Sequence, residues 1–378
     1  LKDKVKLLNF SYIHKKFTYK KLLNFIIELF KLKRYKKDYK IKITLSLGEP
    51  ANLFNVLSKL SNEKIILSFH NHYSTDFSLS QFWNKSFVDK IRKVIRINLI
   101  KFLYQRADLM VAVSNGVKND LIKNFGLKED KIKVIYNPFL ISDIKNKASE
   151  DIKEFRSIFN HKTIITVGRL SMQKGHWYLL RIFRELKRRI NDLKLIIIGD
   201  GELKDFLINL SKSLQLKTFV WDRDLVSENF DVYFMGPQAN PFKFMAKASL
   251  FVLSSLYEGL PSVIIEALAC GIPVVSADCK SGPREILAPD TDFAFQTRQV
   301  EYAKYGILLP PFDGELKKLS DPLTEEENIW VCSLSEILSQ KDLLEYYGKL
   351  GLERALDFDA SKISKEWNEV FEGILKES

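Results

Sequence analysis

Short apolar runs alternate with amphipathic segments along most of this chain. Runs such as Lys64–Phe69, Leu193–Ile198 and Leu250–Ser254 have the length of buried strands. The segments between them, such as Tyr19–Leu32 and His176–Arg189, place apolar residues at helical spacing. This alternation predicts parallel sheets with helices on both faces, and therefore an α/β protein.

The same pattern predicts most of the remaining elements. Further strands are expected at Val5–Phe10, Ile41–Ser46, Asp108–Val113, Ile132–Tyr136, Thr163–Val167, Val232–Met235, Pro273–Ala277 and Tyr305–Leu309, and further helices at Ala51–Leu60, Asn84–Gln105, Leu334–Ala355 and Ala360–Leu375. Ser114 is expected to cap a helix that ends near Gly126. Residues 142–160 are polar and predict a linker.

The stretch Ser254–Val275 combines a strand end, a loop and a short helix. Pro261 stands where the first helical residue is expected, and Gly271 where the C-terminal cap is expected. A helix that starts directly after a parallel strand favours an anion, because its first N–H groups are free. Glu258 precedes this helix and Glu266 lies inside it, too deep to be its cap. Two carboxylates beside a phosphate cradle indicate a ligand with both hydroxyls and phosphate, such as a nucleotide sugar.

Four segments together resemble family 4 of the retaining glycosyltransferases, which have the GT-B fold. They are EGLPSVIIEALACGIPVV from Glu258, VGRLSMQKG at Val167–Gly175, the run Val232–Ser255, and SADCKSGPREIL at Ser276–Leu287. Their order and spacing match the family over roughly residues 160–290. The last segment is typical of members that build bacterial surface polysaccharides and lipid-linked oligosaccharides.

The resemblance implies two doubly wound, Rossmann-like domains that face each other across a cleft. We expect an acceptor-side domain over residues 1–155, a nucleotide-sugar domain over 156–360, and a last helix over 361–378 that crosses back to the first domain. The family's opening strand, Gly-rich loop and helix are not found, so the first domain is expected to lack its first βα unit.

The implied reaction moves a hexose or N-acetylhexosamine, with retention, from a nucleotide sugar to a lipid-linked or polysaccharide acceptor. A UDP-linked donor is expected, with GDP as the nearest alternative, and no metal or other cofactor. The resemblance implies that Arg169 and Lys174 bind the diphosphate, that Glu266 binds the ribose, and that Glu258 binds the sugar. Backbone groups of the donor site are expected at Gly236, Pro237, Leu260, Pro261 and Ser262.

The resemblance also implies a histidine that faces the reacting sugar. His70, directly after a predicted strand, matches that position best, and His72 is the fallback. Arg284 in the last of the four segments is expected either near the donor sugar or in a structural ion pair. The Asp-x-Asp at Asp222–Asp224 is expected to be a surface loop rather than a metal site.

The net charge of +12 is concentrated in residues 1–150, and the rest of the chain is mildly acidic. Such a basic half suits an anionic membrane, a lipid diphosphate or nucleic acid, although a coding bias explains it equally well. Nucleic acid is not expected, because no motif for it accompanies the charge. The basic segment Tyr19–Leu32 fits either a membrane-surface helix or an ordinary solvated helix.

Cysteine usage and hydropathy bear on location. Cys270, Cys279 and Cys332 form neither a metal motif nor a disulfide framework, which favours a reducing compartment and hence the cytoplasm. No apolar run is long enough to predict a spanning helix, so any membrane contact is expected to be peripheral. Two other function classes stay open, namely a GT-B enzyme that is not a transferase, such as a nucleotide-sugar epimerase, and a non-catalytic binder.

Overall fold

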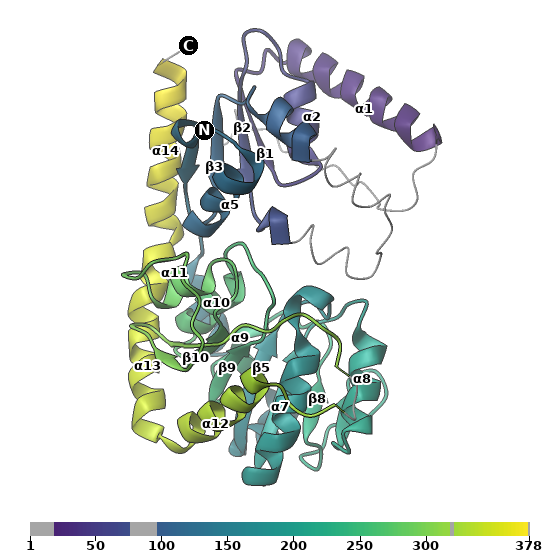
Figure 1. The fold of residues 1–378 in the computed structure, drawn as a ribbon, viewed down its shortest axis with the longest axis vertical. Coiled ribbons are helices and arrows are strands. Elements are labelled where there is room, and N and C mark those ends of the chain that lie inside the picture. The colour runs from purple at the N-terminus through teal and green to yellow at the C-terminus, as the bar shows by residue number, and fades with distance from the viewer. Residues whose placement is uncertain (1–18, 76–96, 318–320, 377–378) are drawn as a thin grey trace.

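The computed structural model describes residues 19–75, 97–317 and 321–376, which form two α/β lobes. Figure 1 shows the N-terminal lobe above and the C-terminal lobe below, with the last helix lying along the upper lobe. The predicted strand Val5–Phe10 and most of the predicted helix Asn84–Gln105 lie outside the described residues.

The N-terminal sheet has four parallel strands within the described residues, in the order β1-β2-β3-β4. Their bounds are β1 Ile43–Leu47, β2 Lys64–Phe69, β3 Leu109–Ala112 and β4 Ile132–Val134. Successive side chains of a strand point to opposite faces. In β2, Ile65 and Leu67 therefore enter the main core, while Ile66 packs with Ile363 and Val370 of α14 (Ala360–Lys376) on the other face.

The helices of the N-terminal lobe include α1 Tyr19–Asp38, α2 Ala51–Leu57 and α5 Asn115–Phe125. The hydroxyl of Ser114 accepts a hydrogen bond from the N–H of Val117 and so caps α5. Gly126 ends the same helix in the left-handed conformation, with φ of 61°. Both ends of α5 are as predicted from the sequence.

The C-terminal sheet has eight strands within the described residues, in the order β11-β12-β10-β9-β5-β6-β8-β7, and β11 is antiparallel to β12. Their bounds are β5 Lys162–Val167, β6 Leu193–Ile198, β7 Thr218–Val220, β8 Val232–Phe234, β9 Leu250–Leu253, β10 Val274–Ala277, β11 Glu301–Tyr302 and β12 Ile307–Leu309. Ile164 and Leu195 pack on one face of this sheet, and Ile165 and Ile196 on the other. The continuous apolar runs of its strands are thus explained by burial on both faces.

The helices of the C-terminal lobe are α7 His176–Arg189, α8 Lys204–Ser213, α9 Phe242–Met245, α10 Ser262–Ala269, α11 Pro283–Leu287, α12 Glu325–Ser339 and α13 Lys341–Ala355. The prediction of one helix over Leu334–Ala355 is wrong. Gln340 leaves the helical conformation and separates α12 from α13, and α12 begins earlier, at a capping box of Thr324 and Glu327.

The prediction of a linker over residues 142–160 is also wrong. This segment forms helix α6, Ile141–Ala148, and a 3-10 helix over Lys153–Asn160. Ile141, Ile144 and Ile158 are buried, and α6 packs against α9 and α10. Three isoleucines among many polar residues are enough to anchor the segment to the C-terminal lobe, because each buries its whole side chain.

The chain crosses between the lobes twice, and the two crossings lie side by side. Phe139 donates its N–H to the carbonyl of Phe358 at 2.9 Å and accepts the N–H of Ala360 at 2.8 Å. These hydrogen bonds hold the two crossings together where the lobes join. Within the described residues, no helix is both long and apolar enough to cross a membrane.

Candidate active site

A largely buried ion pair lies at the carboxyl ends of β5 and β9. The Nζ of Lys174 is 2.6 Å from Oε1 of Glu258, and the hydroxyl of Ser255 donates to the same oxygen at 2.6 Å. Gln173 donates to the other carboxylate oxygen at 3.3 Å. An ammonium has three donors, and among the described residues Nζ of Lys174 makes a hydrogen bond and ion pair only with Glu258. The pair therefore keeps donors of Lys174 and part of Oε2 available to a ligand.

Close backbone packing holds this pair in place. Gly175 has φ of 59°, and a Cβ at this position would lie 2.3 Å from the carbonyl oxygen of Ser254. The hydroxyl of Ser254 donates to the carbonyl of Lys174 at 2.9 Å. Only glycine fits here, since any side chain would separate the two loops. The Lys-Gly step thus lets the lysine loop lie directly on the end of β9.

The N-terminus of α10 lies at the same sheet edge. Pro261, predicted to be the first helical residue, is instead its N-cap, so the helix begins one position later, at Ser262. Pro261 makes no capping hydrogen bond through its side chain. Ser262 interacts with the carboxylate of Glu266, one turn into the helix. Burial raises the pKa of Glu266, although Ser262 and Lys174 partly offset this. A half-buried carboxylate beside free helical N–H groups suits a ligand that carries both hydroxyls and phosphate.

The structure does not bring Arg169 to this ion pair. Its guanidinium is 3.1 Å from a carboxylate oxygen of Glu202, and the side chain is 73% exposed. Arg169 would have to leave Glu202 to reach a diphosphate at Lys174. Its role in donor binding remains a prediction.

Gly236 and Pro237 follow β8. They lie at the same edge of the sheet as Glu258, which follows β9, but β5 and β6 stand between these two strands. The ring of Trp221 packs on Gly236 so closely that a Cβ there would lie 2.4 Å from the ring. The Nζ of Lys204 lies 3.7 Å above the centre of the same ring and 2.7 Å from Asp222. Sequence reasoning missed this contact of Trp221 with the expected base wall, because β7 and β8 are separated by a long loop.

The segment Asp222–Asp224 forms a turn after β7. Among the residues with described positions, no group of three His, Cys, Asp or Glu side chains could hold a metal ion.

His70 follows β2 and reaches the C-terminal lobe through its backbone. A Cβ at Gly259 would lie 1.9 Å from the carbonyl oxygen of His70, so the loop that carries Glu258 packs directly on this residue. Burial lowers the pKa of His70, and its Nε2 lies 3.1 Å from the hydroxyl of Ser68. The imidazole is therefore neutral at physiological pH. His72, two residues further on, contacts Thr75 and Asp120 instead.

A second contact between the lobes depends on Glu285, which is 1% exposed. Its carboxylate accepts from the backbone N–H of Asn115 at 2.8 Å, from the amide of the same residue at 2.7 Å, and from the hydroxyl of Tyr136 at 2.9 Å. Ser114 donates its hydroxyl to the carbonyl of Gly259 at 2.8 Å. Glu285 thus caps the N-terminus of α5 from the opposite lobe, where a negative charge is favoured.

Arg284 forms a structural ion pair, one of the two alternatives left open by the sequence. Its guanidinium is 2.6 Å from Asp278 and 2.6 Å from Glu301, and the residue is 4% exposed. These contacts tie the loop after β10 to β11.

Comparison with known proteins identifies the family. Residues 148–308 match the family model described as glycosyl transferases group 1, and residues 8–139 match the model described as glycosyltransferase family 4. An uncharacterized glycosyltransferase of Methanocaldococcus jannaschii is 36% identical over 332 residues, which cover 86% of this chain and 76% of that protein. The chain belongs to the family 4 glycosyltransferases. It is an enzyme of sugar transfer, and the resemblance found in its sequence is confirmed.

Two further proteins are similar to this glycosyltransferase, one in sequence and one in structure. A Campylobacter jejuni protein named N-acetylgalactosamine-N,N'-diacetylbacillosaminyl-diphospho-undecaprenol 4-alpha-N-acetylgalactosaminyltransferase is 34% identical over 268 residues, covering 71% of this chain and 61% of that protein. The crystal structure of HepE from Anabaena in complex with UDP-glucose superimposes with a TM-score of 0.68, at 19% identity, over 91% of this chain and 82% of that one. The GT-B fold predicted from the sequence is thereby confirmed.

Proposed function

We propose that this glycosyltransferase moves a hexose or N-acetylhexosamine, with retention, from a UDP-sugar to a lipid-linked or polysaccharide acceptor. The Campylobacter relative is named for transfer to a diphospho-undecaprenol-linked sugar, and the Anabaena neighbour holds UDP-glucose. The single observation that carries the proposal is the largely buried Lys174–Glu258 pair, 2.6 Å apart, beside the N-terminus of α10. A cation, free helical N–H groups and carboxylates meet there at one sheet edge.

In this proposal, the main task of the site is to stabilise the departing diphosphate. Lys174 and the backbone N–H groups of Leu260 and Ser262 donate to the phosphate oxygens as negative charge develops on them. Glu258 accepts from the hydroxyls of the transferred sugar, and Glu266 accepts from those of the ribose. Arg169 adds a second cation once it leaves Glu202.

In this proposal, the N-terminal lobe covers the face of the site where the sugar reacts. His70 is neutral and lies against the Glu258 loop, so its imidazole can donate or accept a hydrogen bond at the sugar. Retention requires that the acceptor attack from the side that the leaving group occupied. The departing phosphate, held by Lys174, then takes the proton of the acceptor hydroxyl.

Transfer from radiolabelled UDP-sugars tests the proposal, with a lipid extract and a polysaccharide extract as acceptor sources. We expect label to enter an acceptor product whose anomeric configuration by NMR matches the donor. Lys174→Ala should lower the rate at least ~100-fold, the scale of losing one charge-stabilising donor. The rate should be unchanged by EDTA, because protein groups stabilise the negative charge of the diphosphate. Inverted product, or full activity of Lys174→Ala, would contradict the proposal, and UDP-sugar consumption without acceptor would favour an epimerase.

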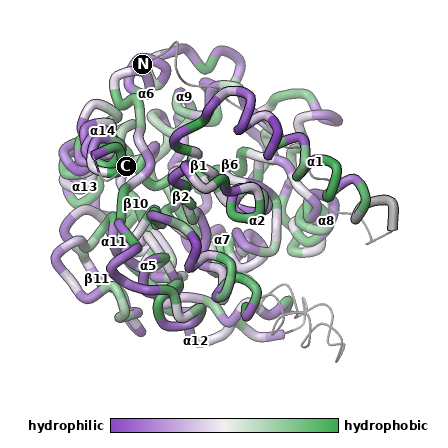
Figure 2. Tube along the Cα trace, turned by 90° about the horizontal axis from the view of Figure 1, so that it is seen from above, coloured by the Kyte–Doolittle hydropathy of each residue, from purple (hydrophilic) through white to green (hydrophobic). Residues whose placement is uncertain are grey.

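We further propose that α1 binds an anionic membrane surface on the cytoplasmic side. Four apolar side chains on this helix are exposed, namely Leu23, Ile26, Ile27 and Phe30. Lys31, Lys33, Arg34 and Lys37 on the same helix are also exposed. Figure 2 shows α1 at the edge of the molecule, with hydrophobic and hydrophilic residues interleaved along it. An apolar stripe flanked by cations matches lipid tails below anionic headgroups.

A further inference from the structure

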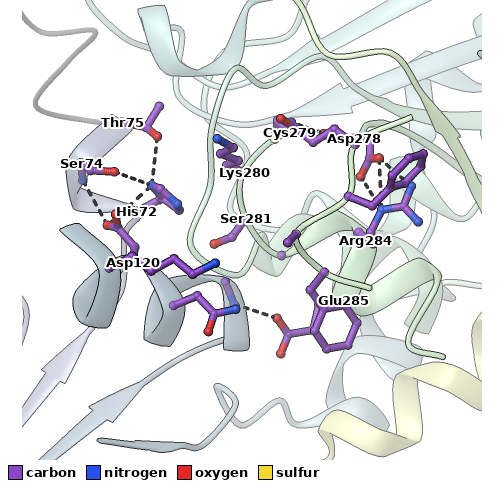
Figure 3. A pocket seen from close by; sticks show the side chains of 18 of the residues that line it. His72, Ser74, Thr75, Asp120, Asp278, Cys279, Lys280, Ser281, Arg284 and Glu285 are labelled. Carbon is purple, nitrogen blue, oxygen red and sulfur yellow. Dashed lines mark hydrogen bonds and ion pairs between the residues drawn. The ribbon is translucent and has the colours of Figure 1, made fainter. Parts of the chain in front are cut away.

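A cavity of about 400 Å³ lies between the two lobes, next to the Glu258 loop. Helix α5 and the segment after β2 form one wall, and residues 278–285 and 293–296 form the other. In Figure 3, Lys280 and Ser281 lie between two groups of side chains. His72 and Asp120 are on one side of them, and Arg284 is on the other. The cavity opens at the carboxyl ends of the strands of both sheets, where α/β proteins bind ligands.

The carboxylates in the cavity wall already have donors within the protein. Asp278 binds Arg284 at 2.6 Å, and Glu285 accepts from the N-terminus of α5. Asp120 accepts from the backbone N–H of Ser74 at 3.1 Å and from the amide of Asn124 at 2.7 Å. These acid groups are therefore not aimed at a cation from solution.

Two lysines in the wall differ from these paired groups. Lys123 on α5 and Lys280 after β10 are exposed and line the cavity, and neither side chain makes a hydrogen bond or ion pair with any described residue. Burial lowers the pKa of His72 on the opposite wall, Asp120 raises it, and the charge of Lys280 lowers it. One lysine from each lobe thus lines the same cavity without a partner for its side chain among the described residues, which suits an anion.

The cavity adjoins the place where the sugar would react. The backbone carbonyl of Lys280 accepts the N–H of Glu258 at 2.8 Å, and Ser281 donates its N–H to the carbonyl of Glu258 at 3.0 Å. On the other wall, His72 is two residues from His70, which packs on Gly259. The cavity therefore borders the Glu258 loop on one side and the segment that carries His70 on the other.

An aromatic ring completes the wall. Phe295 lines the cavity, is 54% exposed, and has the guanidinium of Arg284 4.9 Å from its ring centre. A ring fixed in this way offers a flat apolar surface to the C–H face of a sugar, as aromatic side chains commonly do in binding sites.

We propose that this cavity is an acceptor subsite that takes a phosphate-bearing saccharide, with the phosphate on Lys123 and Lys280 and its sugar against Phe295. This inference rests on the proposed function, because it assumes that a sugar is transferred at Glu258. It adds the chemistry of the acceptor, namely an anionic group carried a short distance from the accepting hydroxyl. The phosphate can belong to a lipid diphosphate or to a phosphorylated polysaccharide.

Calorimetric titration of the UDP complex tests the subsite, because saturating UDP occupies the donor phosphate site first. Pyrophosphate and, in a parallel arm, inorganic phosphate are then titrated into the wild type, Lys123→Ala and Lys280→Ala. Lys118→Ala is the matched control, since Lys118 lies on the same helix and pairs with Glu129. We expect pyrophosphate to bind the UDP complex, and its Kd to rise at least ~10-fold in either cavity variant, the scale of one charged hydrogen bond. The control should bind like the wild type.

The outcomes separate this inference from the proposed function. UDP binding followed by no pyrophosphate or phosphate binding, or by equal binding in all variants, overturns the subsite and leaves the proposed function intact. Absence of UDP binding in the first step overturns both. Tighter binding of pyrophosphate than of phosphate assigns a lipid diphosphate as the source, and equal binding assigns a single phosphate on a polysaccharide.

Discussion

A single residue of this site, Glu266, lowers the stability of the folded chain when no ligand is bound. Burial raises the pKa of its carboxyl, so the folded chain holds this proton more tightly than the unfolded chain. At a pH above both values the group is ionised in a poorly solvated place, which lowers the free energy of unfolding. At a pH below the value of the unfolded chain, this cost is absent. A ligand hydroxyl that donates to the carboxylate would recover part of it.

Glu266→Gln should therefore separate stability from donor binding. At pH 8 we expect the ligand-free variant to have a higher Tm than the wild type, and the difference should shrink as the pH falls to 5. The Kd for UDP should rise at least ~10-fold, since a charged acceptor for the ribose hydroxyls is lost. Thermal unfolding with and without UDP at both pH values measures this. A variant that is less stable at pH 8, or that binds UDP normally, would speak against the assigned role.

The short elements around the cleft depend on contacts that no local pattern reveals. Glu285 was visible in the sequence only as part of a family-like segment, yet it caps α5, which lies 170 residues earlier in the chain. Arg169, by contrast, was expected at the donor and instead contacts Glu202. Element type and position followed from apolar periodicity, whereas such pairings depend on how the two lobes approach each other.

At the level of elements, moving the carboxylate from position 285 to position 115 tests the contact of α5 with the loop after β10. Asn115→Asp places a second carboxylate against Glu285, and we expect transfer to slow at least ~10-fold, the scale of one charged hydrogen bond. UDP binding should not change, because neither residue touches the donor groups. Adding Glu285→Gln should restore most of the rate, since the new amide can donate to Asp at 115. Steady-state kinetics that show no loss in the single variant, or no recovery in the double variant, would refute the coupling.

For the whole molecule, the two-sheet organisation was predictable from the sequence, and parts of the connecting structure were not. The strand β2 and the helix α7 lie where the apolar pattern placed them, because each is buried over its full length. The helix α6 was mistaken for a linker, since three buried isoleucines stand among polar residues. The break at Gln340 was missed because apolar spacing continues across it.

The exposed apolar face of α1 allows a test of how the molecule meets a membrane. Ile26→Ser with Phe30→Ser should reduce co-sedimentation with phosphatidylglycerol vesicles several-fold, because the lost apolar area is worth roughly 25 cal/mol per Å². The Tm should stay within about a degree, as both side chains are exposed. Leu225→Ser is the matched control, since Leu225 is 91% exposed on the other lobe. Vesicle binding that is equal in all three proteins would rule out α1 as the membrane contact.

Nucleotide binding by the wild type and by Lys174→Ala, followed as a shift in Tm with UDP, GDP and ADP, tests whether the Lys174–Glu258 pair forms the donor site. We expect UDP to stabilise the wild type, by ~2.7 kcal/mol at 100 times its Kd, and Lys174→Ala to lose most of this effect. Lys304→Ala, which removes an exposed lysine paired with Asp290, should respond like the wild type. No shift with any nucleotide, or an equal UDP shift in Lys174→Ala, would contradict the central claim that the Lys174–Glu258 pair forms the donor site.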